Sequence, residues 1–169
     1  MDITLEYNIL NSNSSQNMIS CNDHNKCVSD SINQAKEICH KNGLRFTDLR
    51  QKIFSIILQN HQPSKAYDVL SILQKEDSSA KPATIYRSLD FLLECGLIHK
   101  LHISNSYVVC SHPLRHNRCS FLICNKCNEV QECCDKQLST EVEKMGSKNN
   151  FKIEYVAVEI RGICSSCIS

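Results

Sequence analysis

The chain lacks both a long apolar run and the pattern of an export signal. Its longest apolar runs, such as residues 56–58, are far too short to cross a bilayer. The segment Met1–Glu6 is acidic and has neither the basic start nor the apolar stretch of a secretory signal. We therefore expect a cytoplasmic, reducing setting with no membrane partner, in which cysteines bind metal instead of forming disulfides.

Patterns of zinc and thiol enzymes are also missing. The sequence contains no His-Glu-x-x-His protease pattern and no His-x-Glu deaminase pattern. Neither of its Cys-x-x-Cys pairs opens a helix in a thioredoxin-like unit. We expect no enzyme and no small-molecule substrate, and a zinc or thiol enzyme is the alternative from another functional class.

A strong charge of either sign is absent, since the formal net charge is +1 at pH 7. The positive excess lies in the middle of the chain, where residues 34–105 carry ten Lys or Arg against seven Asp or Glu. This excess gives modest support to a polyanionic partner.

The 12 cysteines are the main positive feature, and four of them form two Cys-x-x-Cys pairs. Four thiolates in two tight pairs make a tetrahedral cage that suits zinc. The 36 residues between the pairs exceed the spacing of a zinc finger and can hold a strand, a helix and a second strand. The spacing predicts a structural zinc that closes a small α/β domain, with ligands Cys124, Cys127, Cys164 and Cys167.

Hydrophobic periodicity predicts four helices and a hairpin before this domain. Thr47 is the expected N-cap of the second helix, and Pro82 lies in the first turn of the fourth, which ends at Gly96. The expected elements are helices at residues 31–41, 47–59, from 64 and from 82, then strands at 97–103 and 107–110. Such an arrangement is a winged helix-turn-helix.

The fourth helix is the recognition candidate for the major groove of DNA. Its inward set is Ile85, Leu89 and Leu92, which leaves Thr84, Tyr86 and Arg87 on other faces. Helix-turn-helix units also serve as protein-interaction modules, so both possibilities stay open.

The chain therefore has an α+β organisation in four parts. We expect a flexible tail at 1–30, a winged-helix DNA-binding domain at 31–110, a hinge at 111–118 and a zinc-clasped domain at 119–169 with a three-stranded sheet. In the last part, strands are expected at 120–124 and 129–132. A helix is marked by Leu138, Val142 and Met145. The longest strand spans 151–160, and its inward set shifts phase, which indicates either a bulge near Tyr155 or burial on both faces.

A second set of metal ligands flanks the hinge. The candidates are His99 and His102 on the wing, Cys110 at its end, His112 and His116 in the hinge, and Glu132. One ion bound by His99, Cys110, His116 and Glu132 would fix the two domains in one orientation, and this mixed shell suits zinc.

The remaining cysteines receive no such role. Cys39, Cys95 and Cys119 are interpreted as small core or half-buried residues. Cys133 and Cys134 are adjacent, so their side chains diverge, and Cys21, His24 and Cys27 in the tail could at most hold a metal weakly.

Taken together, the motifs resemble the ferric uptake regulator superfamily over about residues 32–168. The segments that carry this resemblance are Leu44–Arg50, Ala66–Leu70, Lys81–Leu89 and the two Cys-x-x-Cys pairs. Within the superfamily, Phe91–Glu94, Gly96–Lys100 and Asn105–Cys110 are similar to zinc uptake regulators.

The resemblance implies a homodimeric, metal-dependent repressor that binds inverted-repeat operator DNA and controls zinc-acquisition genes. It implies an α/β dimerisation domain and two zinc ions per monomer, one at the four paired cysteines. The regulatory zinc would bind His99, Cys110, His116 and Glu132, and Tyr67 and Arg87 match positions that face DNA.

Two departures matter. His116 stands eight residues before Cys124 where the zinc-regulator pattern has seven, so His112 is its rival. Asn117–Ser120 replaces the His-rich stretch of iron-sensing members, which favours zinc sensing over the alternative of iron or peroxide sensing.

Overall fold

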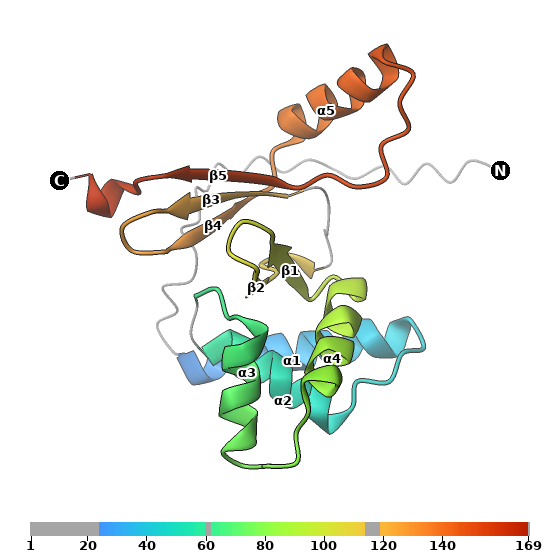
Figure 1. Cartoon of the computed structure of the whole chain (residues 1–169). Coiled ribbons are helices and arrows are strands. Elements are labelled where there is room, and N and C mark those ends of the chain that lie inside the picture. The colour runs from blue at the N-terminus through green and yellow to red at the C-terminus, as the bar shows by residue number, and fades with distance from the viewer. Residues whose placement is uncertain (1–23, 60–61, 114–118, 169) are drawn as a thin grey trace.

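The computed structural model describes residues 24–59, 62–113 and 119–168. Its helical part is followed by a hairpin and then by a three-stranded sheet, which lies on the other side of the hairpin from the helices (Figure 1). Most of the expected tail, including Cys21, and the hinge residues 114–118 with His116 lie outside the described residues. None of the helices in the described ranges has the length and apolar character needed to cross a membrane.

Four helices form the first part: α1 His24–Lys41, α2 Asp48–Gln59, α3 Ala66–Gln74 and α4 Pro82–Glu94. Helix α1 begins earlier than Ser31, the predicted start, because Val28 and Ile32 extend its apolar face onto the core. Helix α3 begins later than predicted, because Ser64 instead exchanges two backbone hydrogen bonds of 2.9 Å with Tyr107.

The predicted helix boundaries of α2 and α4 are confirmed at the residues that set them. The Thr47 hydroxyl accepts a hydrogen bond of 3.4 Å from the Arg50 amide, which is the expected N-cap contact. Pro82 occupies the first turn of α4, and Gly96 follows the helix with φ +66°, a left-handed conformation that favours glycine. Helix α4 buries Ile85, Leu89 and Leu92, as predicted.

The wing is an antiparallel hairpin of β1 Ile98–Leu101 and β2 Ser106–Val109. Strand β1 is shorter than predicted, whereas β2 has the predicted length but begins one residue earlier, at Ser106. Asn105 in the connecting turn has φ +48°. Three packed helices, a fourth exposed on one side and this hairpin confirm the winged helix-turn-helix.

The second part is a sheet with strand order β4-β3-β5, formed by β3 Ser120–Cys124, β4 Val130–Cys133 and β5 Val158–Gly162. Strand β4 is antiparallel to β3, and β5 is parallel to it. Helix α5 Lys136–Lys148 makes the crossover and extends away from the sheet (Figure 1). The predicted three-stranded sheet with one helix is confirmed.

The predicted strand at 151–160 is wrong over residues 151–157. Strand β3 has only five residues, and all five pair with Val158–Gly162, so the preceding segment finds no partner strand within the described chain. Phe151 and Tyr155 in this segment remain 70% and 69% exposed. Large apolar side chains in such a position indicate a surface that another chain can cover.

Candidate metal centres and nucleic-acid interface

The first candidate centre lies where β3 and β5 end side by side. Cys124 is the last residue of β3, and Cys127 follows in the turn that leads to β4. Because β5 runs parallel to β3, the residues after β5 lie beside the end of β3. Cys164 immediately precedes a short 3-10 helix, Ser165–Cys167, and Cys167 is its last residue. The four sulfurs lie within 4.8 Å of one another, and Cys127 Sγ is 3.7 Å from Cys164 Sγ.

This donor set fits zinc. Sulfurs bound tetrahedrally at about 2.3 Å from one ion stand about 3.8 Å apart. The Cys164 amide donates a hydrogen bond of 3.4 Å to Cys124 Sγ. Together with backbone hydrogen bonds from the turn, this contact lowers the pKa of Cys124 to about 6, which favours the thiolate that a metal requires.

The second candidate centre lies between the wing and the sheet. His99 Nε2 on β1 is 3.2 Å from Glu132 Oε1 on β4. The Cys110 thiol donates to the same oxygen over 3.8 Å. Only 2% of the Glu132 side chain and 11% of the His99 side chain are exposed. Three of the four predicted regulatory ligands thus lie together, and the fourth, His116, falls outside the described residues.

A buried ionisable group loses the stabilisation of its charged form by water, and hydrogen bonds or nearby charges must offset this loss. Burial alone would raise the pKa of Glu132, but hydrogen bonds from His99 and from the Ser111 amide bring it down to about 2. Burial, followed by the charge of Glu132, raises the pKa of Cys110 to about 12. A bound cation stabilises both the carboxylate and a thiolate, so this donor set also fits a metal ion.

Three further groups surround Glu132. Cys119 shares a cluster with His99 and Glu132, in which all ligand atoms lie within 4.8 Å of one another. His112 and Cys134 form a second such cluster with Glu132. The sequence interpreted Cys119 as a small core or half-buried residue, and it is half-buried, but this interpretation missed its proximity to His99 and Glu132. The proximity depends on the pairing register of β3 and β4.

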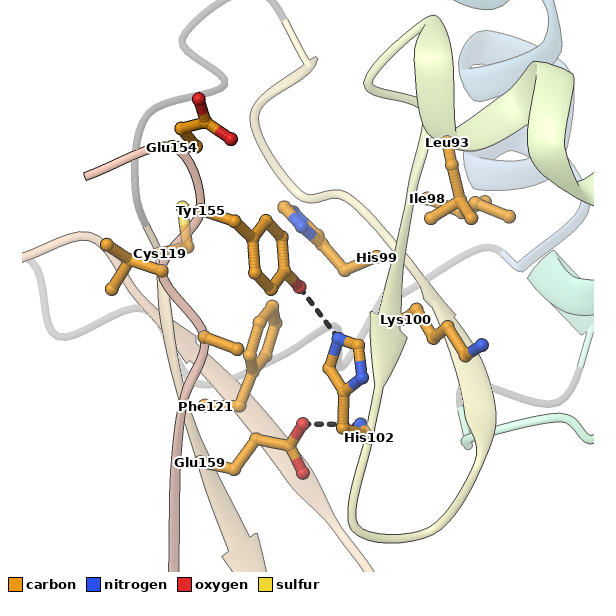
Figure 2. Close-up of a pocket in the computed structure, with 12 residues that line it drawn as sticks. Leu93, Ile98, His99, Lys100, His102, Cys119, Phe121, Glu154, Tyr155 and Glu159 are labelled. Carbon is orange, nitrogen blue, oxygen red and sulfur yellow. Dashed lines mark hydrogen bonds between the residues drawn. The ribbon is translucent and has the colours of Figure 1, made fainter. Parts of the chain in front are cut away.

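His102, which was a candidate ligand, makes a different interdomain contact (Figure 2). Its Nε2 is 2.7 Å from the Tyr155 hydroxyl. The Glu159 carboxylate accepts hydrogen bonds from the backbone amides of His102 and Ile103. These bonds join the wing turn to Tyr155, which lies before β5, and to Glu159 in β5 itself, beside a hollow of about 500 Å³.

The predicted DNA-facing residues occupy α3 and α4. Tyr67 on α3 is 75% exposed and Tyr86 on α4 is 51% exposed. Arg87 is also exposed, whereas Thr84 is half-buried. Exposed aromatic and cationic side chains on the two helices of a helix-turn-helix are suited to phosphate and base contacts.

The amino-acid sequence is similar to those of metal-uptake regulators. The model of the "Ferric uptake regulator family" matches residues 41–161. The chain is 34% identical over 138 residues to the zinc uptake regulation protein of Escherichia coli K12, which covers 80% of each chain. It is 28% identical over 126 residues to the ferric uptake regulation protein of Neisseria gonorrhoeae, covering 74% of this chain and 87% of that protein.

The structure is also similar to solved structures of zinc uptake regulators. A zinc uptake regulator in complex with zinc and DNA has a TM-score of 0.80 and 31% identity, covering 83% of this chain and 95% of that one. The holo form of XcZur has a TM-score of 0.76 and 30% identity, covering 81% of this chain and 96% of that one. The relative placement of wing and sheet in this chain is therefore similar to that of metal-bound structures.

Proposed function

Since the chain belongs to the ferric uptake regulator family, we propose that it is a zinc-responsive repressor of zinc-acquisition genes. It binds inverted-repeat operator DNA as a dimer when it is zinc-loaded. The observation that carries this proposal is the buried contact of His99 and Cys110 with Glu132, which joins the winged helix to the sheet. The similarity to a zinc uptake regulator bound to zinc and DNA supports it.

Two zinc ions per monomer have separate tasks in this proposal. Cys124, Cys127, Cys164 and Cys167 hold the structural ion. His99, Cys110, His116 and Glu132 hold the regulatory ion, and residues 111–118 form the hinge between the winged helix at 31–110 and the dimerisation domain at 119–169. Thiolate and imidazole donors favour zinc over iron, which supports zinc sensing over the iron-sensing alternative.

The regulatory site works by conformational selection. Zinc supplies the positive charge that holds an imidazole, a thiolate and a carboxylate together. His99 belongs to the wing and Glu132 to the sheet, so they meet only when the two domains are closed against each other. A ligand that prefers the closed state by 1–3 kcal/mol raises DNA affinity about 5- to 150-fold.

In the closed dimer, two copies of α4 enter the major groove at the two half-sites. Arg87 and Tyr86 contact DNA from α4 together with Thr84, and Tyr67 contacts it from α3. Phosphate contacts by the basic side chains make binding fall steeply with salt concentration. The two-fold symmetry of the dimer requires an inverted repeat.

The test compares DNA affinity with one and with two zinc ions bound. An operator is first selected from random duplexes with fully zinc-loaded protein. Removing the weaker zinc with a chelator is expected to weaken binding about 5- to 150-fold, as measured by fluorescence anisotropy. Unchanged binding would contradict the mechanism, and restoration by iron at concentrations where zinc does nothing would assign iron sensing instead.

Dimerisation is proposed to cover the apolar surface around α5 and the segment that follows it. Met145 and Phe151 are 60% and 70% exposed, and both line a hollow of about 560 Å³ together with Val142 and Ile153. Contiguous exposed apolar side chains of this size mark an interface. The occupant is a second copy, because an inverted repeat requires two.

Phe151→Glu is expected to weaken the dimer by about 2 kcal/mol or more, since it places a charge in a desolvated interface. That corresponds to a roughly 30-fold rise in the dissociation constant, measured by analytical ultracentrifugation. Leu44→Glu is the matched control, because Leu44 is 43% exposed but lies in the helical part. A Phe151→Glu protein that remains as dimeric as this control would exclude the proposed surface.

A further inference from the structure

The pairing of β3 with β4 decides which cysteines face the wing. Phe121 pairs with Glu132, and directly opposed residues of an antiparallel pair share a face. Cys119 directly precedes β3 and Cys134 directly follows β4. Continuing the alternation of side chains past the strand ends puts Cys119 on the side of Phe121 and Cys134 on the side of Glu132, and both thiols do cluster with Glu132. Cys133, which pairs with Ser120, lies on the opposite face.

The wing places His99 directly over this shared face. The imidazole packs edge-on against the Phe121 ring, with 5.0 Å between the ring centroids. Its Nε2 lies 3.2 Å from Glu132 Oε1. The Cys119 sulfur lies within 4.8 Å of the ligand atoms of both His99 and Glu132. A half-buried thiol is thus aimed at the centre that the regulatory ion would occupy.

We infer that Cys119 is itself a ligand of the regulatory metal ion and gives the site a second thiolate beside Cys110. This inference rests on the proposed zinc-responsive function. His99, Cys119 and Glu132 form one cluster, and the Cys110 sulfur lies 3.8 Å from Glu132 Oε1. The four residues together supply two sulfurs, one nitrogen and one oxygen, the number of donors that a tetrahedral zinc site needs. In this shell Cys119 takes the fourth position, which the proposed function gives to His116.

A second thiolate changes the metal preference of the site. Soft sulfur ligands select zinc against iron and manganese, which prefer nitrogen and oxygen. Two thiolates and a carboxylate also leave the zinc-bound centre with one net negative charge. Cys119 is therefore expected to raise both the affinity of the site for zinc and its selectivity for zinc over iron and manganese.

Cys134 is the competing thiol, because it shares the face and clusters with Glu132. It is exposed, however, and its cluster contains His112 instead of His99. Among the described thiols outside the proposed set, Cys119 alone shares a cluster with His99. The geometry favours Cys119 for this reason.

The test uses cobalt in place of the regulatory zinc, because thiolate ligands give cobalt a charge-transfer absorption that scales with their number. Full-length protein that retains its structural zinc is titrated with cobalt. Cys119→Ser is expected to lower the absorption of the second site by about half and to weaken zinc binding there by at least tenfold. Cys133→Ser, the matched control from the opposite face, is expected to leave both unchanged.

Three outcomes would overturn the inference. Full absorption in Cys119→Ser would remove Cys119 from the shell, and loss in Cys134→Ser alone would assign the sulfur to Cys134. A wild-type protein that takes up no second metal would overturn the regulatory site and the proposed function with it. Metal occupancy of wild type therefore separates failure of the proposed function from failure of this inference.

A measurement without any variant guards against misfolding of Cys119→Ser. Wild-type protein carrying one or two zinc ions is treated with a thiol alkylating reagent, and modified cysteines are located by mass spectrometry. The second zinc is expected to protect Cys119 and Cys110 together, while Cys133 reacts at the same rate in both forms. Equal alkylation of Cys119 in both forms would contradict its role as a ligand.

Discussion

Replacing Cys110 by serine is expected to reduce the zinc content from two ions per monomer to one and to abolish the zinc dependence of DNA binding. Cys110 is only 4% exposed and lies 3.8 Å from Glu132 Oε1. A serine hydroxyl fills nearly the same space but does not supply a thiolate at neutral pH. Operator affinity should fall about 5- to 150-fold, to that of protein with one zinc. Elemental analysis and fluorescence anisotropy measure the two effects.

Cys95→Ser provides the control for Cys110→Ser. Cys95 is a half-buried thiol that lies 3.9 Å from Cys39, inside the winged-helix core and away from both candidate centres. Its replacement should leave two zinc ions and full operator affinity. A Cys110→Ser protein that keeps two zinc ions and still responds to zinc would show that Cys110 is no ligand.

Local signals made the α+β fold predictable from sequence. The caps of α2 and α4 depend on Thr47, Pro82 and Gly96, whose effects extend over one helical turn. The two Cys-x-x-Cys pairs predicted a four-sulfur cluster because each pair is local, and the parallel pairing of β3 with β5 brings the pairs together. The cluster of four cysteines could therefore be predicted before the fold was known.

The position of Cys119 depended on information that the sequence does not display. Its proximity to His99 arises from strand register and from the way the wing packs on the sheet, both of which are long-range properties. A one-residue shift in register would have exposed Cys133 to the wing in place of Cys134. The hydrogen bonds from the wing turn to Glu159 could not be predicted for the same reason. Their donors, the amides of His102 and Ile103, precede Glu159 by 57 and 56 positions in the sequence.

The error at residues 151–157 has a related cause. Apolar and charged residues alternate at the start of this segment, which also contains residues common in β-strands, and both features favour a strand. A strand, however, needs a neighbouring strand whose backbone groups are free to pair with it. Strand β3 ends its pairing at Val158, so the segment leaves Phe151 and Tyr155 exposed. A pattern of apolar residues predicts that their side chains will be buried. It does not show whether they pack against the same chain or against a second copy.

Cys164→Ser is expected to have a different and larger effect than Cys110→Ser, because it removes a ligand of the proposed structural ion. Among the described residues, the sheet belongs to a core cluster of five buried residues: Leu101, Val108, Phe121, Ile123 and Val130. Two of these come from the wing, so the sheet itself contributes only three. A domain of about 50 residues needs a metal or a partner to remain folded. We expect loss of the structural zinc, loss of the dimer and loss of operator binding together.

The winged helix should survive this change, since its own core cluster contains 18 buried residues from α1 to β2. Circular dichroism should therefore retain the helical signal while ultracentrifugation reports a monomer. Ser166→Ala is the control, because Ser166 is exposed between Cys164 and Cys167 but is no ligand. If Cys164→Ser stayed dimeric and lost only the zinc response, the four-cysteine centre would be regulatory. Because Cys110→Ser should spare the dimer and Cys164→Ser should destroy it, the pair of variants assigns the two ions their separate tasks.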